Sequence, residues 1–71
     1  MKHEQFKRIW IPLSSSFYNV ARHFLEDESD AEDAVQDLYV RLWNSKDDLE
    51  KVQNPKAYGL TLIRNICIDR I

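Results

Sequence analysis

The sequence predicts an all-α fold, a small bundle of three main helices at about residues 12–26, 29–44 and 55–71, with a short N-terminal helix at about 2–11. Apolar residues recur at three- and four-residue steps in these ranges, the spacing of helices that bury one face. The 71 residues include one glycine, two prolines and 44% hydrophobic residues. Such a composition suits helices and is too apolar for a disordered chain.

The first 26 residues predict two helices separated at a proline. Phe6, Ile9 and Trp10 have amphipathic spacing in the short N-terminal helix. Pro12 cannot continue that helix but suits the first turn of another, so we expect a break there. The second helix carries an apolar stripe of Leu13, Phe17, Val20, Ala21, Phe24 and Leu25.

The third helix has a start signal and two distinct faces. Ser29 with Glu32 forms a capping box, which predicts that the helix begins at Ser29. One face is apolar and expected in the core: Ala31, Ala34, Val35, Leu38 and Leu42. The other is acidic at its start and apolar at its end: Asp33, Gln36, Asp37, Val40 and Trp43. This second face favours contact with a partner, with burial of Trp43 in the core as the alternative.

A polar loop and a final helix complete the chain. The loop, residues 45–54, is expected to hold at most one helical turn, and Leu49 and Val52 are candidates to pin it to the core. Asn54 followed by Pro55 predicts a capped start for the last helix. We expect its core side to comprise Leu60, Ile63, Cys67 and Ile71, its neighbouring stripe Tyr58, Leu62, Asn65 and Asp69, and its solvent flank Thr61, Arg64 and Ile68.

Charge is distributed unevenly along the chain. Residues 26–50 carry ten acidic and two basic side chains, whereas the segments before and after each carry four Lys or Arg and one acid. Such asymmetry favours different partners at the two ends, with ordinary solubility as the alternative.

Several function classes are disfavoured by composition. Cys67 is the single cysteine, and His3 and His23 are too far apart for zinc-ligand spacing, so we expect neither disulfide, metal nor cofactor. No nucleophile stands with a base and no glycine-rich phosphate loop occurs, so we expect a protein that is not an enzyme. Lacking a signal segment and any run near the roughly 20 apolar residues of a membrane span, it is expected to be cytoplasmic.

Two linked motifs resemble region 2 of bacterial sigma factors of the extracytoplasmic-function class. Residues 31–43, AEDAVQDLYVRLW, match the family's Ala-Glu-Asp-x-x-Gln pattern at Ala31, Glu32, Asp33 and Gln36. Residues 57–70, AYGLTLIRNICIDR, match its aromatic, aliphatic, Asn and Asp positions at Tyr58, Leu62, Asn65 and Asp69. Gly59 departs from the pattern, where a larger residue is usual, and is expected to loosen the helix start.

The resemblance implies two partners. The helix 29–44 would dock on the clamp helices of the largest subunit of core RNA polymerase, and many members also have an anti-sigma factor that covers the same surfaces. The implied polymerase contacts are Asp33, Gln36, Asp37, Tyr39, Val40 and Trp43. The loop and last helix would hold the single-stranded minus-ten element of promoter DNA, capturing an extruded base in a pocket built mostly by the loop. The implied DNA contacts are Lys46, Lys51, Gln53, Asn54, Lys56, Tyr58, Thr61, Leu62, Arg64 and Asn65.

Thr61 and Leu62 occupy positions where primary sigma factors have paired tryptophans, so melting is expected to depend on base capture more than on an aromatic wedge. The resemblance also predicts a single region 2 domain over residues 1–71, without the family's C-terminal helix-turn-helix domain, as in a fragment. Two other classes stay open: a stand-alone helical regulator that binds duplex DNA, and a helical protein-interaction adaptor with no nucleic-acid role.

Overall fold

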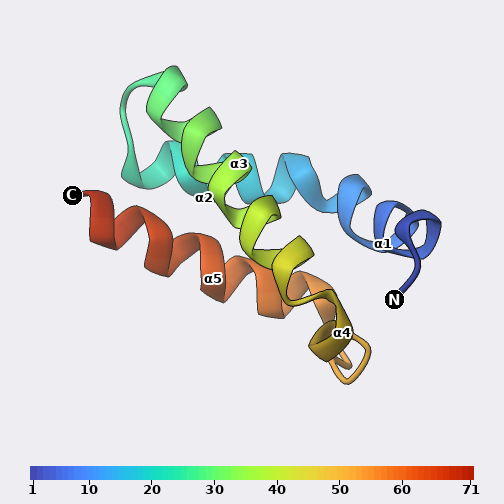
Figure 1. Cartoon of the computed structure of the whole chain (residues 1–71). Helices are drawn as coiled ribbons and strands as arrows, with labels where there is room; N and C mark the ends of the chain where they lie inside the picture. Colours follow the sequence, from blue (N-terminus) through green and yellow to red (C-terminus); the bar gives the residue numbers. More distant parts are fainter.

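A computed structural model describes all residues from Met1 to Ile71, and it is all-helical (Figure 1). The elements are α1 (His3–Trp10), the 3-10 turn η1 (Ile11–Leu13), α2 (Ser14–Phe24), α3 (Glu28–Asn44), α4 (Lys46–Leu49) and α5 (Pro55–Arg70). The expected all-α bundle of three main helices and a short N-terminal helix is therefore confirmed. The break predicted at Pro12 is η1, and the loop 45–54 holds the single turn α4.

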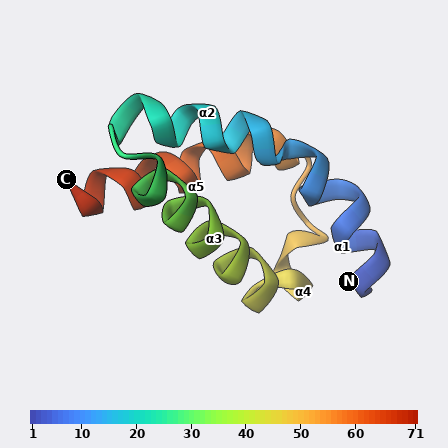
Figure 2. The ribbon, with the colours of Figure 1, turned by 90° about the horizontal axis from the view of Figure 1, so that it is seen from above.

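Helices α2, α3 and α5 pack on one another in every pairwise combination. Helices α2 and α5 run side by side in the same direction, while α3 runs in the opposite direction (Figures 1 and 2). Helix α1 and the short α4 lie at the end of the bundle remote from the C-terminus. The N-terminal helix is thus close to the loop 45–54 rather than to the C-terminal part of α5.

One hydrophobic core joins all of these elements, and no polar or charged residue is buried in it. Leu49 is buried and Val52 packs against the core, so the two residues do pin the loop. The core comprises Phe6, Trp10, Phe17, Ala21, Leu25, Ala31, Ala34, Leu38, Leu42, Leu49, Ile63, Ile66 and Cys67.

Two expectations for α5 are wrong, namely the burial of Ile71 and a loosening of the helix at Gly59, and the packing of α5 on α2 explains both. Ile71 is 78% exposed, and the buried place at this end of the helix is taken by Ile66. Apolar residues occur on several sides of α5, so spacing alone does not say which side is covered; the packing on α2 decides it. There Gly59 is buried and lies so close to Phe17 that an added Cβ would be 2.3 Å from the ring carbon Cζ. The helix is continuous through this glycine, so no loosening is observed.

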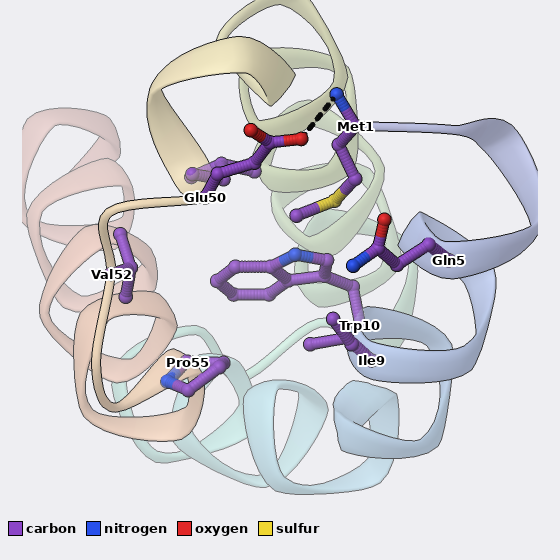
Figure 3. Close-up of a pocket in the computed structure, with 8 residues that line it drawn as sticks. Met1, Gln5, Ile9, Trp10, Glu50, Val52 and Pro55 are labelled. Carbon is purple, nitrogen blue, oxygen red and sulfur yellow. Dashed lines mark ion pairs between the residues drawn. The ribbon is translucent and has the colours of Figure 1, made fainter.

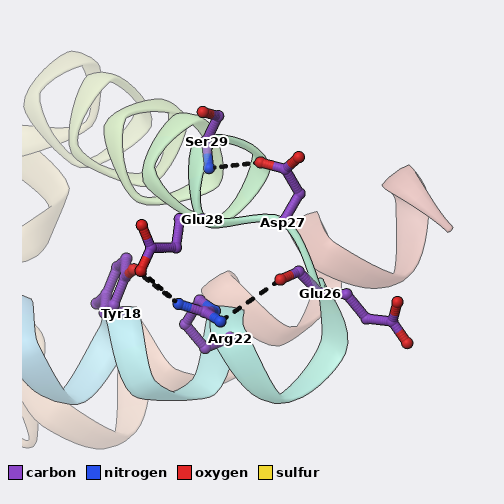
Figure 4. Close-up of polar contacts among 6 residues, drawn as sticks. All are labelled: Tyr18, Arg22, Glu26, Asp27, Glu28 and Ser29. Carbon is purple, nitrogen blue, oxygen red and sulfur yellow. Dashed lines mark hydrogen bonds and ion pairs between the residues drawn. The ribbon is translucent and has the colours of Figure 1, made fainter.

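The start of α3 also differs from the prediction. The helix begins at Glu28, and the N-cap is Asp27, whose extended backbone lets its carboxylate accept the Ser29 N–H at 2.7 Å (Figure 4). Asp27 and Ser29 are both good capping residues. The path of the short connection from α2 determines which of them is used.

An arginine holds that connection in place. Arg22 of α2 donates to the Tyr18 hydroxyl at 3.3 Å, to the Glu28 carboxylate at 3.2 Å and to the Glu26 carbonyl at 3.5 Å (Figure 4). These bonds join the end of α2 to the first residue of α3, so they help to set where α3 starts.

Candidate functional site

The outer face of α3 is formed by exposed side chains that follow one another at helical steps: Asp33, Gln36, Val40 and Trp43. Val40 is 58% exposed and Trp43 is 36% exposed, so two neighbouring apolar side chains meet solvent beyond the acidic and polar pair. An isolated exposed apolar residue is ordinary, but an apolar pair beside charged residues is typical of an interaction surface. The structure thus places four of the six predicted polymerase contacts together.

Trp43 is neither a core residue nor a free surface residue. Its ring meets Phe6 of α1 edge-on, with centroids 5.1 Å apart, and lies 5.3 Å from the ring of His3. The ammonium of Lys46 lies 4.5 Å from the centroid of the Trp43 ring, within cation–π range. The question left open by the sequence is therefore resolved as partial burial: α1 supports the tryptophan while part of it stays exposed.

Asp37 differs from the other predicted contacts, because it already has intramolecular partners. Arg41 donates to both of its carboxylate oxygens, at 3.3 and 3.2 Å, and Arg70 of α5 lies 4.0 Å away. About a third of the Asp37 side chain is exposed. The carboxylate links α3 to the end of α5, and any basic group from a partner would compete with two arginines for it.

Tyr39 lies on the inner flank of α3 rather than at the rim of the outer face. Its hydroxyl donates to the backbone carbonyl of Trp10 at 2.7 Å, and its ring is 6.1 Å from that of Phe17. Burial raises the pKa of Tyr39 to about 12. The carbonyl acceptor also favours the protonated hydroxyl. Tyr39 thus ties α3 to the end of α1.

The predicted DNA contacts on α5 fall into two groups. Tyr58, Thr61 and Asn65 are exposed and follow one another at helical steps, forming the exposed stripe of α5, with Arg64 exposed beside it. Leu62 is half-buried and packs against the core. The structure therefore brings together an aromatic ring, a hydroxyl, an amide and a cation, and sets Leu62 apart from them.

The remaining predicted DNA contacts lie at the start of α5 and in the loop before it. Lys51, Gln53 and Lys56 are exposed. Asn54 is exposed as well, but its side-chain oxygen accepts the Ala57 N–H at 3.0 Å and caps α5, as the sequence predicted. Lys46 is half-buried against Trp43, on the side of the molecule that carries the outer face of α3.

A pocket of about 370 Å³ lies between α1, the end of α4 and the start of α5 (Figure 3). The loop 45–54, which the resemblance implied would build most of a pocket, supplies only Leu49, Glu50 and Val52 of the eight lining residues. Half of the lining comes from the N-terminal segment, namely Met1 and the α1 residues Gln5, Ile9 and Trp10, and Pro55 completes it. The only indication of this role in the sequence was the apolar stripe of α1, because such a stripe must pack against another part of the chain.

Trp10 connects this pocket to the exposed stripe of α5. It is completely buried, and its Nε1 has no hydrogen-bond partner. Its ring meets that of Tyr58 edge-on at 6.2 Å, so it supports the one aromatic residue of the stripe, which is 43% exposed. At the rim of the pocket the N-terminal ammonium of Met1 pairs with Glu50 at 2.9 Å, and this hydrogen bond raises the pKa of the ammonium (Figure 3).

Other kinds of site find little support among these side chains. No three of the His, Cys, Asp or Glu residues come together as ligands for a metal ion. Cys67 is buried, and burial raises the pKa of its thiol, which disfavours the reactive thiolate. None of the helices combines the length and the apolar character needed to cross a bilayer.

These features define a small helical domain with two separate exposed surfaces, the outer face of α3 and the exposed stripe of α5. A family model described as sigma-70 region 2 matches residues 13–71, and the chain belongs to that family. The resemblance drawn from the two sequence motifs is therefore confirmed.

Curated relatives point to the same class. The chain is 26% identical over 66 residues to the ECF RNA polymerase sigma factor SigX of Bacillus subtilis (strain 168), a match that covers 93% of this chain and 34% of the relative. It is 28% identical over 69 residues to the ECF RNA polymerase sigma factor SigK of Mycobacterium sp. (strain KMS), covering 96% of this chain and 36% of the relative. The chain thus spans about a third of the length of these relatives. No solved structure matches it.

Proposed function

We propose that this chain is a transcription initiation factor domain that docks on bacterial core RNA polymerase and recognises and helps to melt the promoter minus-ten element. The observation that carries the proposal is the presence, on different helices, of two exposed surfaces of different chemistry: the acidic and apolar outer face of α3, and the exposed stripe of α5 with its aromatic, hydroxyl and amide groups. Membership of the sigma-70 region 2 family, and relatives named as RNA polymerase sigma factors, support it. The proposed place of action is the cytoplasm.

Docking would be a helix-on-helix contact with the clamp helices of the largest polymerase subunit. Val40 and Trp43 supply the apolar centre, and Asp33 and Gln36 supply the charged and polar rim. Rim charges chiefly accelerate association and select the partner, whereas a desolvated apolar centre supplies affinity. Asp37 contributes less directly, because Arg41 and Arg70 already neutralise it. An anti-sigma factor that covered the outer face of α3 would exclude polymerase.

DNA recognition would use the exposed stripe of α5 and the pocket beneath the loop. Tyr58 can stack on an unpaired base, Asn65 has the donor and acceptor needed to read a base edge, and Thr61 cannot act as an aromatic wedge. An extruded base needs an apolar pocket with polar groups at its edge. The cavity between α1 and the loop has apolar walls and a Gln5 amide in its lining, which support a role in base capture.

Polymerase docking is tested by measuring the affinity of core polymerase for the wild-type chain and for Asp33→Lys combined with Val40→Asp. We expect binding by the wild type and a loss of at least about tenfold in the variant, since the pair removes both charge complementarity and apolar contact. Glu26→Lys makes the same charge reversal as Asp33→Lys and is the control for that substitution, because its side chain projects away from the polar contacts of the α2–α3 connection (Figure 4). If wild type and double variant bound equally, the docking proposal would be lost.

DNA recognition is tested by comparing single-stranded minus-ten DNA with duplex of the same sequence, with and without core polymerase. We expect the single strand to bind better, and better still with polymerase, because a chain of net charge −2 offers few phosphate contacts to duplex. Tyr58→Ala should weaken single-strand binding about 5- to 100-fold by loss of stacking, whereas Tyr58→Phe should retain most of it. Tight duplex binding without polymerase would favour the stand-alone duplex regulator instead. Binding of neither polymerase nor DNA would favour the adaptor.

A further inference from the structure

Lys46 was grouped with the DNA contacts on sequence grounds, but its surroundings belong to α3. Its ammonium lies 4.5 Å from the centroid of the Trp43 ring, and its side chain is half-buried. A lysine held over an aromatic face has its charge localised there, and its apolar stem covers part of the ring. Lys46 is therefore a fixed cation at the end of the outer face of α3.

A second nitrogen-bearing side chain, that of His3, approaches the same tryptophan from α1. The His3 ring is 5.3 Å from that of Trp43, tilted by 58°, and Phe6 supports the tryptophan edge-on. His3 is exposed. The surface around Trp43 thus includes two elements besides α3, with nitrogen-bearing side chains from both.

The charge changes sign from one end of this surface to the other. Asp33 lies at one end and Lys46 at the other, with the exposed Val40 and Trp43 between them. Asp33 and Trp43 are ten residues apart on one helix, which corresponds to about 15 Å at 1.5 Å per residue. A partner helix can match both ends only in one orientation.

We propose that Lys46 is part of the polymerase-docking surface rather than of the DNA-binding surface, and that the partner presents a carboxylate to it. The partner segment would carry a basic group opposite Asp33 and an acidic group about 15–20 Å further along, opposite Lys46, spaced by the helical rise. This inference rests on the proposed function, since it names a further element of the same docking contact. Lys46 would help to fix the orientation of docking, because reversed docking would place like charges opposite each other at both ends.

Lys46 and Lys51 make a matched pair for the test, because both lie in the segment 45–54 and only Lys46 contacts Trp43. The association rate with core polymerase would be measured at several salt concentrations for Lys46→Gln, Lys46→Glu and Lys51→Gln, together with the affinity of each variant for single-stranded minus-ten DNA. We expect Lys46→Gln to slow association about 2- to 5-fold and Lys46→Glu about 10-fold, with a weaker salt dependence for Lys46→Gln. Lys51→Gln should leave association unchanged and weaken DNA binding.

The opposite pattern would overturn the inference: Lys46→Gln weakening DNA binding as much as Lys51→Gln does, with polymerase association unchanged. Polymerase binding by the wild type that is sensitive to Asp33→Lys but indifferent to Lys46→Glu would also overturn it, while leaving the docking proposal intact. Absence of polymerase binding by the wild type would instead refute the proposed function. Thermal unfolding of each variant checks that the fold is retained.

Discussion

Replacing Gly59 by alanine is the sharpest test of how α2 and α5 pack. An alanine Cβ at this position would lie 2.3 Å from Cζ, 2.5 Å from Cε1 and 3.2 Å from Cε2 of the Phe17 ring. Ordinary carbon contacts are about 3.5–4.0 Å. The ring is completely buried, so it cannot turn out into solvent, and either the ring or the helix must shift.

Two opposing terms set the size of the effect. In a helix interior alanine is favoured over glycine by about 1 kcal/mol, whereas overpacking a core costs typically about 1–3 kcal/mol. Because the overlap exceeds 1 Å against a buried ring, we expect the upper part of that range and a net destabilisation of about 1–2 kcal/mol. The unfolding entropy for a chain of this length is about 0.15 kcal/mol/K, so the melting temperature should fall by about 7–13 °C.

The measurement is thermal and urea unfolding followed by circular dichroism at the helix band. Thr61→Ala compared with Thr61→Gly, at an exposed position of the same helix, gives the local propensity difference without the clash. Phe17→Leu should destabilise the Gly59→Ala variant less than it destabilises the wild type, because it removes the overlapping ring atoms. If Gly59→Ala raised the melting temperature by the propensity difference, the close packing of the two helices would be refuted.

Two further predictions follow from the α3 cap and from Tyr39. Asp27→Ala should lower the free energy of unfolding by about 1 kcal/mol, and Ser29→Ala by less than about 0.5 kcal/mol, since Asp27 makes the capping bond. Urea unfolding measures both values. A larger loss for Ser29→Ala than for Asp27→Ala would favour the capping box of Ser29 and Glu32 instead. Tyr39→Phe should cost about 1 kcal/mol at neutral pH through the lost bond to Trp10. The raised pKa of about 12 means that this hydroxyl stabilises the fold fully below pH 10 and progressively less toward pH 12. The stability gap between wild type and Tyr39→Phe should therefore narrow over that range, and a constant gap would contradict the assignment.

Features set by neighbouring residues were predictable from the sequence. Spacing at three and four residues located the buried side of α3, and Asn54 with Pro55 marked the start of α5 with its capping bond. Pro12 marked the break before α2. These signals depend on backbone geometry and side chains within one or two turns, so they do not require knowledge of the packing.

Where local signals were ambiguous, the predictions failed. Asp27 and Ser29 are both suitable caps, and the connection held by Arg22 determines which one serves. Ile66 and Ile71 are equally apolar, and the close approach of α5 to α2 determines which one is buried. In both cases the local preferences are nearly equal, and a contact with another helix decides between them.

The two exposed surfaces were also only partly predictable from the sequence. Helical periodicity alone placed Asp33, Gln36, Val40 and Trp43 on one face of α3 and Tyr58 and Asn65 on a face of α5. Only the tertiary structure brought α1 against Trp43 and beneath the loop, paired Asp37 with Arg70, and moved Lys46 to the α3 side. These contacts join residues distant in sequence, and they form because a chain this short must use every helix, including the N-terminal one, to cover its core.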